Sequence, residues 1–257
     1  MEIKNIFIVG AGNVGSHLAK ALAKVVKIVG VYSLNQCSAK ELSDELYVPF
    51  FSNISSIPAC DLVLVCVNDN SVIEVVKQIP STFKTAYTSG NIELSTLPDF
   101  ENIGVFYPLQ TFSKSKELNL KEVPFFIEGT NAEFTNELIK LASLISSNVS
   151  ISNSIERKKM HLAAVFVNNF SNHLAFLAKE YLDENNLKWE YLKPLMIETV
   201  NKLSEVSPYE AQTGPARRND TKVIESQLTE LSGTTKEIYQ VFSSSIINTY
   251  HNKNDKL

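Results

Sequence analysis

The first fifteen residues, MEIKNIFIVGAGNVG, contain the feature that most constrains the fold. An apolar run that ends at Val9 is followed by glycines at positions 10, 12 and 15, and then by SHLAKALAKV, a segment rich in helix-forming residues. A GxGxxG turn between a buried strand and a helix is the fingerprint of a dinucleotide-binding site. Gly10 allows the tight turn, Gly12 lets the backbone approach a pyrophosphate, and Gly15 lets the helix pack against the strand. The alternative is an ordinary strand-to-helix turn.

The N-terminus of this predicted helix supplies the expected phosphate contacts. Its first backbone N–H groups, those of Asn13, Val14 and Gly15, have no partner within the helix and lie at the positive end of its dipole. Phosphate groups are stabilised at such a helix end. We therefore expect these residues, together with Gly10 and Gly12, to bind the cofactor.

The composition restricts the remaining function classes. The 257 residues include 24 Lys and Arg and 28 Asp and Glu, and a net charge of −4 argues against nucleic acid as a partner. Cys37, Cys60 and Cys66 have no metal-ligand spacing, and their odd number is typical of a reducing compartment. No apolar run reaches the length of a membrane span, and no signal peptide precedes the first strand. We expect a cytoplasmic protein without a metal site or a membrane partner.

The end of the second predicted strand, residues 25–33, bears on the choice of cofactor. In dinucleotide sites an Asp or Glu at this point binds the ribose 2′-hydroxyl of NAD and repels the 2′-phosphate of NADP. Here the strand ends without a carboxylate, and Ser33 and Asn35 can donate to a phosphate. No arginine is present to bind the phosphate, and Lys40 is more simply explained as a solvated lysine of the next helix. The sequence therefore favours NADP, with NAD as the alternative.

Polar residues follow the next strand of the predicted sheet. The apolar run at 61–67 predicts a central parallel strand, because such strands are buried on both faces. Val67, Asn68 and Asp69 lie at its carboxyl end, where an open α/β sheet binds its ligand, and are candidates for cofactor contacts. Asn and Asp are also the preferred residues of caps and turns, which is the alternative explanation.

Two further loops are expected to line a substrate pocket. Thr88 ends a short strand that starts at Thr85, and Ser89 follows it. The polar run from Gln110 to Ser113 follows the strand predicted at 103–108. Because the carboxyl ends of parallel strands meet at one edge of a sheet, these residues should lie near the cofactor.

The predicted sheet ends where helical periodicity begins. A strand at 123–129, a helix at 132–145 and a strand at 148–152 complete the first domain. The fold class is therefore an α/β Rossmann-like N-terminal domain with a mostly parallel sheet, residues 1–152, followed by an all-α C-terminal domain, residues 153–257. Its helices are expected at 156–182, 187–206 with Pro194 as a kink or boundary, 222–231 and 235–250, with a loop at 207–220 and a frayed tail from His251.

One predicted helix carries polar residues in apolar surroundings. His161 and Asn168 are seven residues apart and share a face of a regular helix, Asn169 lies beside them, and Asn172 extends the stripe. Buried amides need hydrogen-bond partners, so the stripe suggests the polar wall of a pocket. His161 suits proton transfer near neutral pH, with Asn169 as an orienting group. A hydrogen-bond network between helices, for example at a dimer interface, explains the same pattern equally well.

The segment TGPARRND, residues 213–220, offers a further charged group. An arginine in such a loop can bind a phosphate or a carboxylate through its planar guanidinium, and Arg218 is the candidate for a substrate carboxylate. Asp220 is better explained as the N-cap of the helix that follows.

These motifs together resemble a family of Rossmann-like proteins with a helical C-terminal domain of unknown function, whose members are often labelled NADP oxidoreductases. The layout is similar to that of the 6-phosphogluconate dehydrogenase-like group, whose helical domain closes a cleft over the cofactor and usually dimerises. The resemblance supports the three glycines as cofactor-binding residues, and it implies a homodimer through the helical domain. It marks His161, Asn169, Arg218 and Asp220 as a polar signature. The matching stretches are GAGNVG (10–15), TSG (88–90), YPLQTFS (107–113), PFFIEG (124–129), HLAAVFVNNF (161–170) and TGPARRND (213–220).

The chain departs from the family pattern at two places. Members often have His where this chain has Tyr87 and Tyr107, so a histidine in those loops is dispensable here. Many members also carry Arg soon after the second strand, where this chain has Leu34 and Asn35, and this weakens the preference for NADP. His161 does not match the Lys-plus-Asn pair of the hydroxyacid dehydrogenases, so their mechanism does not transfer.

Three hypotheses remain. The first is an NADP-dependent oxidoreductase that transfers a hydride between the nicotinamide and a small polar, anionic substrate in the cleft between the domains. The second is a non-catalytic NADP-binding regulatory module. The third is an enzyme like prephenate dehydrogenase, which would need a basic clamp for two carboxylates, with only Arg217 and Arg218 available.

Overall fold

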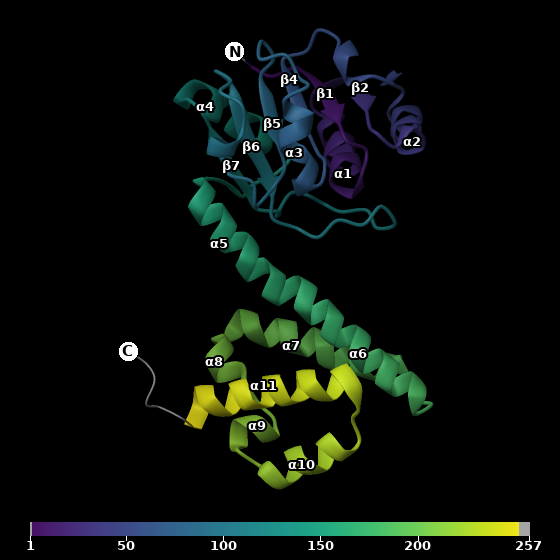
Figure 1. Cartoon of the computed structure of the whole chain (residues 1–257), viewed down its shortest axis with the longest axis vertical. Coiled ribbons are helices and arrows are strands. Elements are labelled where there is room, and N and C mark those ends of the chain that lie inside the picture. The colour runs from purple at the N-terminus through teal and green to yellow at the C-terminus, as the bar shows by residue number, and fades with distance from the viewer. Residues whose placement is uncertain (1, 252–257) are drawn as a thin grey trace. The chain divides into compact units, whose positions relative to one another are not determined.

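The structure, a computed structural model, describes residues 2–251 and divides into two compact units, between Phe170 and Ser171. Figure 1 shows the first unit as a sheet with helices around it and the second as a group of helices. The strands end near Ser152, where the sequence places the end of the first domain, but the first compact unit extends to Phe170.

The first unit is built on a sheet of eight strands within the described residues, in the order β3-β2-β1-β4-β5-β6-β7-β8. Neighbouring strands are parallel except β6 and β7. The chain steps from β1 outward to β3 and then crosses to β4, and this creates the switch point at which such sheets bind ligands. The predicted Rossmann-like, mostly parallel sheet is confirmed. The strands are β1 Asn5–Val9, β2 Lys27–Tyr32, β3 Phe50–Phe51, β4 Leu62–Val65, β5 Thr85–Tyr87, β6 Ile103–Pro108, β7 Phe125–Gly129 and β8 Val149–Ile151.

Helices cover both faces of this sheet. On one face, side chains such as Ile8 and Leu64 pack against α1, α2 and α4 in one apolar cluster. On the other face, side chains such as Val9 and Val65 pack against α3 in a second cluster. Strand residues therefore alternate between two cores, which explains why β1 and β4 read as continuous apolar runs. The helical segments of the unit are α1 Asn13–Leu22, α2 Gln36–Leu46, η1 Ile54–Ser56, α3 Asp69–Val76, η2 Leu94–Thr96, α4 Ala132–Ser143, α5 Ser154–Ala164 and the π-helix η3 Val165–Phe170.

The second unit is helical, as the sequence predicts. Pro194 lies in the first turn of α7, where its missing N–H costs nothing, so it marks a boundary and not a kink. The predicted loop at 207–220 contains two one-turn helices, because Pro208 and Pro215 each start a turn. The last residues of the predicted frayed tail, 252–257, lie outside the described residues. The elements are α6 Ser171–Glu184, η4 Trp189–Leu192, α7 Lys193–Glu205, α8 Pro208–Ala211, α9 Pro215–Arg218, α10 Thr221–Thr229 and α11 Gly233–His251.

The second unit has almost no buried interior of its own. Among its described residues only Ala216, Ile224 and Ser243 are buried. The long helices α6 and α7 have no buried residue at all. A folded domain of this size normally buries a core, so most of the apolar side chains of this unit are left for another surface to cover.

Asp61 joins β1 and β4 at the start of the two central strands. One carboxylate oxygen, Oδ2, accepts backbone N–H groups from Lys4 at 2.9 Å and Asn5 at 2.8 Å, and the Asn5 side-chain amide at 3.0 Å. Burial raises the pKa of Asp61, but these hydrogen bonds outweigh it and hold the pKa below its ordinary value. The ionised form of Asp61 therefore stabilises the strand pairing.

Asp61→Asn should lower the free energy of unfolding at pH 7 by about 1–2 kcal/mol, because it removes a charged acceptor. A depressed pKa contributes stability above the unfolded value of about 4, and this contribution is lost as the pH falls through the folded value. Urea unfolding should therefore show a difference from wild type at pH 7 that shrinks toward pH 3. Glu2→Gln, at an exposed position, is the matched control. An equal loss at both pH values would contradict the electrostatic explanation.

Candidate cofactor and catalytic site

The glycine turn after β1 is close-packed at two of its three glycines. Gly10 has a φ of +106°, and a Cβ there would lie 2.4 Å from the carbonyl oxygen of Cys66. A Cβ on Gly15 would lie 1.9 Å from the carbonyl oxygen of Gly10. Both positions therefore require glycine for the fold itself, as the fingerprint predicts.

Gly12 differs because, apart from its own chain neighbours, no atom of the described residues lies within 4 Å of the position that its Cβ would take. Gly12 is the N-cap of α1, and no side chain bonds to the first backbone N–H groups of this helix. Gly12 and Asn13 are exposed, and Val14 is half-buried. An open space in front of unpaired helix N–H groups is what a pyrophosphate needs. The residues present fit a dinucleotide.

The end of β2 carries the groups that the sequence assigns to the adenosine ribose. Ser33 is half-buried and Asn35 is exposed, with no carboxylate between them. Asn35 is the N-cap of α2, and its Oδ1 accepts the backbone N–H of Ser38 at 3.2 Å. Its amide nitrogen has no hydrogen bond within the described residues. Asn35 can therefore cap the helix and still donate to a phosphate.

The loops after β4 and β5 are connected by side chains. Asn91 donates its amide to Oδ2 of Asp69 at 2.9 Å. Ser89 is buried, and its Oγ accepts the backbone N–H groups of Asn91 and Ile92, both at 3.1 Å. Thr88 is also buried and donates to the carbonyl oxygen of Val65 at 3.4 Å. The two predicted loops thus form one polar edge, in which Ser89 shapes the turn.

A hydrogen bond between Tyr107 and His161 lies beside this edge. The hydroxyl of Tyr107, the fifth residue of β6, is 2.8 Å from Nδ1 of His161 in α5. A Cβ on Gly90 would lie 2.8 Å from this Nδ1 and 2.9 Å from the hydroxyl oxygen. The glycine at position 90 therefore gives the tyrosine–histidine pair room to form against the loop after β5.

The surroundings of Tyr107 keep its hydroxyl neutral. Burial raises the pKa of Tyr107 to about 12, and the charge of Asp69 acts in the same direction. A neutral phenol oxygen can accept the Nδ1–H of the imidazole, and it can also donate to an unprotonated Nδ1. In either case Nδ1 is occupied, so Nε2 of His161 is the nitrogen left to exchange a proton with a ligand.

A buried arginine fixes α5, and with it His161, to the sheet. Arg157 is almost completely buried and forms an ion pair with Glu128 of β7. Its guanidinium also donates to the carbonyl oxygen of Ile92 at 2.6 Å. Ser154, at the start of α5, donates to both oxygens of Glu128. One turn separates Arg157 from His161, so this network sets where the histidine lies.

The helix after His161 changes its hydrogen-bond register. Residues 165–170 form a π-helix, in which i→i+5 bonds take more residues per turn than the i→i+4 bonds of an α-helix. In a regular helix Asn168 would lie about 700° from His161 and share its face, while Asn169 at about 800° would not. The slower rotation of the π-helix brings Asn169 nearer to that face and moves Asn168 away. The expectation that Asn168 shares a face with His161 assumes a regular α-helix, and the π-helix interrupts it. Asn169 therefore lies closer than Asn168 to the face of His161. Both side chains are exposed.

The remaining candidates are dispersed. Gln110, after β6, is exposed and its Oε1 accepts the N–H of Thr111. Arg218 ends α9 in the second unit and is exposed. Its neighbour Arg217 lies 4.0 Å from the ring centre of Tyr250, which gives it a packing role. Asp220 is the predicted N-cap of α10, and its Oδ1 accepts the N–H of Val223.

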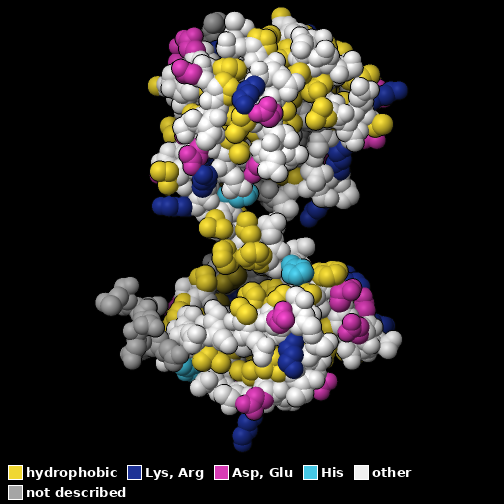
Figure 2. Space-filling model, viewed as in Figure 1, with side chains coloured by type: hydrophobic (Ala, Val, Ile, Leu, Met, Phe, Trp, Pro, Cys, Tyr) yellow, Lys and Arg dark blue, Asp and Glu magenta, His cyan; other side chains and the backbone are white. Residues whose placement is uncertain are grey.

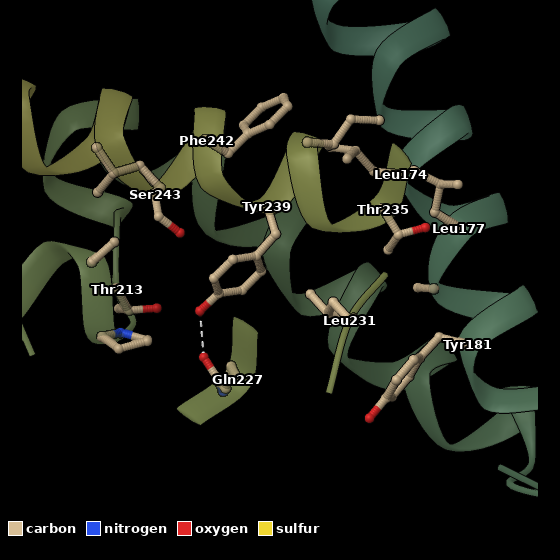
Figure 3. Close-up of a pocket in the computed structure, with 15 residues that line it drawn as sticks. Leu174, Leu177, Tyr181, Thr213, Gln227, Leu231, Thr235, Tyr239, Phe242 and Ser243 are labelled. Atoms are coloured by element: carbon tan, nitrogen blue, oxygen red, sulfur yellow. Dashed lines mark hydrogen bonds between the residues drawn. The ribbon is translucent and has the colours of Figure 1, made fainter. Parts of the chain in front are cut away.

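The second unit contains an apolar cavity of about 460 Å³ between α6, α9, α10 and α11. Figure 3 shows Leu174, Leu177 and Tyr181 of α6 along one side of it, and Tyr239 of α11 with its hydroxyl bonded to Gln227 of α10. The lining offers few polar groups, so this cavity suits an apolar occupant and not the phosphates of a cofactor.

Two findings limit other kinds of site. Among residues 2–251 no group of three or more His, Cys, Asp and Glu side chains is arranged to hold a metal ion. No helix in the same range combines the length and apolar character that crossing a membrane requires.

Sequence reasoning did not assign Tyr107, Gly90, Asn91 or Arg157 to the site. A signal for Tyr107 was present, because a tyrosine at the buried end of a strand needs a hydrogen-bond partner. Arg157 gave no signal, since a single arginine near a helix N-terminus is usually solvated.

Gly12→Val should leave the fold intact and weaken NADPH binding at least tenfold, because the side chain would fill the space in front of the α1 N–H groups. Gly15→Val should instead prevent folding, since its Cβ has no room. Thermal unfolding and NADPH fluorescence titration would separate the two effects. Undiminished NADPH binding by Gly12→Val would contradict the assignment of this space to the pyrophosphate.

Comparisons with known proteins agree with this geometry. Residues 4–86 match a model of the oxidoreductase family with an NAD-binding Rossmann fold, and residues 123–246 match a domain of unknown function, DUF2520. None of the curated proteins compared with the chain matches it.

Solved structures resemble the chain over nearly its whole length. The crystal structure of putative NADP oxidoreductase BF3122 from Bacteroides fragilis is 36% identical, with a TM-score of 0.89, and the match covers 96% of this chain and 98% of that one. A protein from Thermotoga maritima is 20% identical, with a TM-score of 0.70 over 96% and 99% of the two chains. A reductive aminase from Aspergillus terreus in complex with NADPH is 14% identical, with a TM-score of 0.71 over 98% and 95%. The last two show the fold alone.

The identity to the Bacteroides protein, together with the two matching models, decides the family. The glycine turn, the switch-point sheet and the open α1 N-terminus make residues 4–86 part of an NAD(P)-binding Rossmann domain. This chain belongs to the family of Rossmann-like NADP oxidoreductases that carry a helical DUF2520 domain.

Proposed function

We propose that this protein is an NADP-dependent reductase or dehydrogenase that transfers a hydride between the nicotinamide and a C=O or C=N carbon of a small polar, anionic substrate. The observation that carries the proposal is the Tyr107–His161 hydrogen bond beside Gly90. It lies at the carboxyl edge of the sheet, where a Rossmann domain holds its cofactor. An imidazole held at this edge by a phenol is the usual group for proton exchange near pH 7.

The preference for NADP rests on the end of β2. Ser33 and Asn35 can donate to a 2′-phosphate, and no carboxylate is present there to repel it. The reductive aminase from Aspergillus terreus and an imine reductase from Myxococcus stipitatus were solved with NADPH and NADP+, respectively. Val67, Asn68 and Asp69, after β4, are proposed to contact the cofactor near its nicotinamide end.

The chemistry divides between the cofactor and His161. When bound, the cofactor supplies or accepts the hydride at its nicotinamide C4. In reduction, the His161 imidazolium gives its Nε2 proton to the substrate oxygen or nitrogen and becomes neutral, with Nδ1–H still bonded to Tyr107. In oxidation, neutral His161 takes up that proton at Nε2. Tyr107 remains a phenol throughout, because its pKa is raised.

Other side chains are proposed to hold the substrate. They are Thr88 and Ser89, on the polar edge after β5, and Gln110, in the loop after β6. Asn169 orients the substrate or His161 from the π-helix. Arg218 has no ion pair within the described residues, so its guanidinium is available for a substrate carboxylate.

Turnover can be tested with NADPH and a panel of small keto acids, imino acids and their reduced forms. His161→Gln should lower kcat by about 100-fold, which is typical of a lost general acid. Tyr107→Phe should lower kcat by about tenfold through the loss of one hydrogen bond. Asn169→Ala should impair turnover while Asn168→Ala serves as its matched control. The Kd for NADPH should remain unchanged in all four variants.

The direction of the pH dependence follows from the proton that the reaction consumes or releases. Reduction consumes one proton and oxidation releases one, so a higher pH should favour oxidation over reduction. Tight NADPH binding with no turnover of any panel member, and no effect of His161→Gln, would favour a non-catalytic regulatory module instead.

We also propose a homodimer formed through the helical unit. Met196, Val200 and Leu203 are exposed and form an i, i+4, i+7 stripe along α7. On the face drawn in Figure 2, apolar side chains gather on the helical unit. A surface of this kind on a unit with hardly any core is typical of obligate association. A second copy of the chain is the partner that the family resemblance implies.

Light scattering after size-exclusion chromatography should give the mass of a dimer at micromolar concentration. Val200→Glu, in the middle of the α7 stripe, should weaken the dimer and lower the melting temperature of the protein. Leu34→Glu changes a side chain of the first unit that is 80% exposed, and it is the matched control. A monomeric wild-type protein would contradict this assignment.

A further inference from the structure

The connection between β6 and β7 crosses the first unit without forming a helix or a strand. Residues 109–122, named the strap here, belong to the teal loop of Figure 1. Its ends are fixed by backbone hydrogen bonds: the N–H of Leu109 donates to Pro124 at 2.8 Å, and the carbonyl of Lys121 accepts from Ser147 at 2.8 Å. The middle of the strap lies against the cofactor helix α1.

His17 of α1 makes the contact between helix and strap. Its Nε2 is 2.9 Å from the backbone carbonyl oxygen of Lys116, in the strap. Its Nδ1 is 2.8 Å from the backbone carbonyl oxygen of Asn13, one turn back in α1. The ring of Phe112, also in the strap, packs on the imidazole with the ring centres 5.4 Å apart.

Both nitrogens of His17 face acceptors that have no hydrogen to give. A neutral imidazole carries one N–H, so it can satisfy only one of two carbonyl oxygens. The unprotonated nitrogen and its carbonyl oxygen would then face each other with a lone pair each, at hydrogen-bond distance. Only the imidazolium, with an N–H on each nitrogen, satisfies both contacts. The geometry of the closed strap therefore corresponds to a protonated His17.

Few other interactions hold the middle of the strap in place. Among the described residues, the bond from His17 is the only hydrogen bond that residues 111–119 receive from outside the strap. Lys114 adds an ion pair with Glu41 of α2 at 3.8 Å between exposed side chains, which is worth little. Phe112 and Leu118 pack against the core only in part. The hydrogen bond from His17 to Lys116 is thus the main polar contact between the middle of the strap and the rest of the unit.

The charges around His17 come from three elements that surround a polar cavity of about 360 Å³. Four lysines and three glutamates line this cavity, and Lys20 is paired with Glu45 across it. His17 also lies one turn from the N-terminal end of α1, where Asn13 begins the helix and the helix dipole places a partial positive charge. The charged lining residues are Lys20 and Lys24 of α1, Glu41 and Glu45 of α2, and Lys114, Lys116 and Glu117 of the strap.

We propose that the strap is a proton-dependent clasp on the cofactor helix, and that dinucleotide binding favours its closed form. A cation one turn from a helix N-terminus is opposed by the helix dipole. The pyrophosphate, bound at the N–H groups of residues 13–15, removes that opposition and attracts the imidazolium. By linkage, the cofactor raises the proton affinity of His17, and a protonated His17 raises the affinity for the cofactor.

Hydrogen exchange of the strap tests the first part of the proposal. In the wild-type protein the protection factor of the Lys116 amide, which donates to the carbonyl oxygen of Ser113 at 3.1 Å, should fall about tenfold between pH 6 and pH 8, as expected for losing one charge-assisted hydrogen bond to the same residue. His17→Gln keeps a donor for Lys116 but carries no titrating proton, so its protection should not change with pH. His173→Gln, at an exposed histidine of α6, should behave as wild type. If His17→Gln does not fold, ¹H–¹⁵N spectra of the wild-type imidazoles decide, because both His17 nitrogens should carry protons at pH 6.

Calorimetry with NAD+ in two buffers of different ionisation enthalpy tests the linkage. NAD+ is the probe because the 2′-phosphate of NADP+ titrates at about pH 6 itself. Wild-type protein should take up a fraction of a proton per NAD+ at pH 7, and His17→Gln should take up less. Equal proton uptake by both would overturn the link to the cofactor. Strap protection that is the same at pH 6 and pH 8 in the wild type, or an equal pH dependence in His17→Gln, would overturn the clasp.

Discussion

The ion pair between Arg157 and Glu128 is the interaction on which the candidate catalytic site depends. Arg157 stands in the first turn of α5 and Glu128 in β7, so the pair fixes the helix that carries His161 to the sheet that carries Tyr107. Burying a guanidinium is costly unless hydrogen bonds compensate it. Ile92, Ser154 and Tyr87 accept from Nη2 of Arg157, while its Nε is buried without a partner among the described residues. Breaking such a buried pair by removing one partner costs about 3–5 kcal/mol. The position of His161 relative to Tyr107 is therefore set by groups that take no part in the proposed chemistry.

The nucleotide-binding half of the fold could be predicted from the sequence because each of its signals is local. Gly10 and Gly15 are required by backbone geometry within a few residues, and buried parallel strands such as β4 read as unbroken apolar runs. The two-residue strand β3 was missed, since so short a pairing has no periodicity of its own. The loops at Asp69 and Ser89 were placed at one edge by a general rule of parallel sheets, but the hydrogen bond from Asn91 that joins them is a tertiary contact.

The candidate catalytic part was harder to predict because it depends on the hydrogen-bond register of the helix that carries His161. His161 stood out as a polar residue on an apolar helix, yet its partner Tyr107 lies 54 residues earlier in the chain. Regular helical spacing favoured Asn168 as its neighbour on the helix face. The π-helix at 165–170 changes that outcome, and nothing in the sequence VFVNNF distinguishes a π-turn from an α-turn. Sequence periodicity predicts which residues share a face of a helix only where the hydrogen-bond register of the helix stays constant.

The antiparallel pairing of β6 and β7 leaves a long connecting segment that forms no part of the sheet. Two residues suffice to connect adjacent antiparallel strands, but 16 residues separate Pro108 from Phe125. Connections of this length without secondary structure are uncommon in compact domains and usually have a function. Because β7 runs antiparallel to β6, this long segment is not needed to connect the two strands. A fully parallel sheet would have needed that length for a crossover helix, and would have left nothing to lie across the cofactor helix.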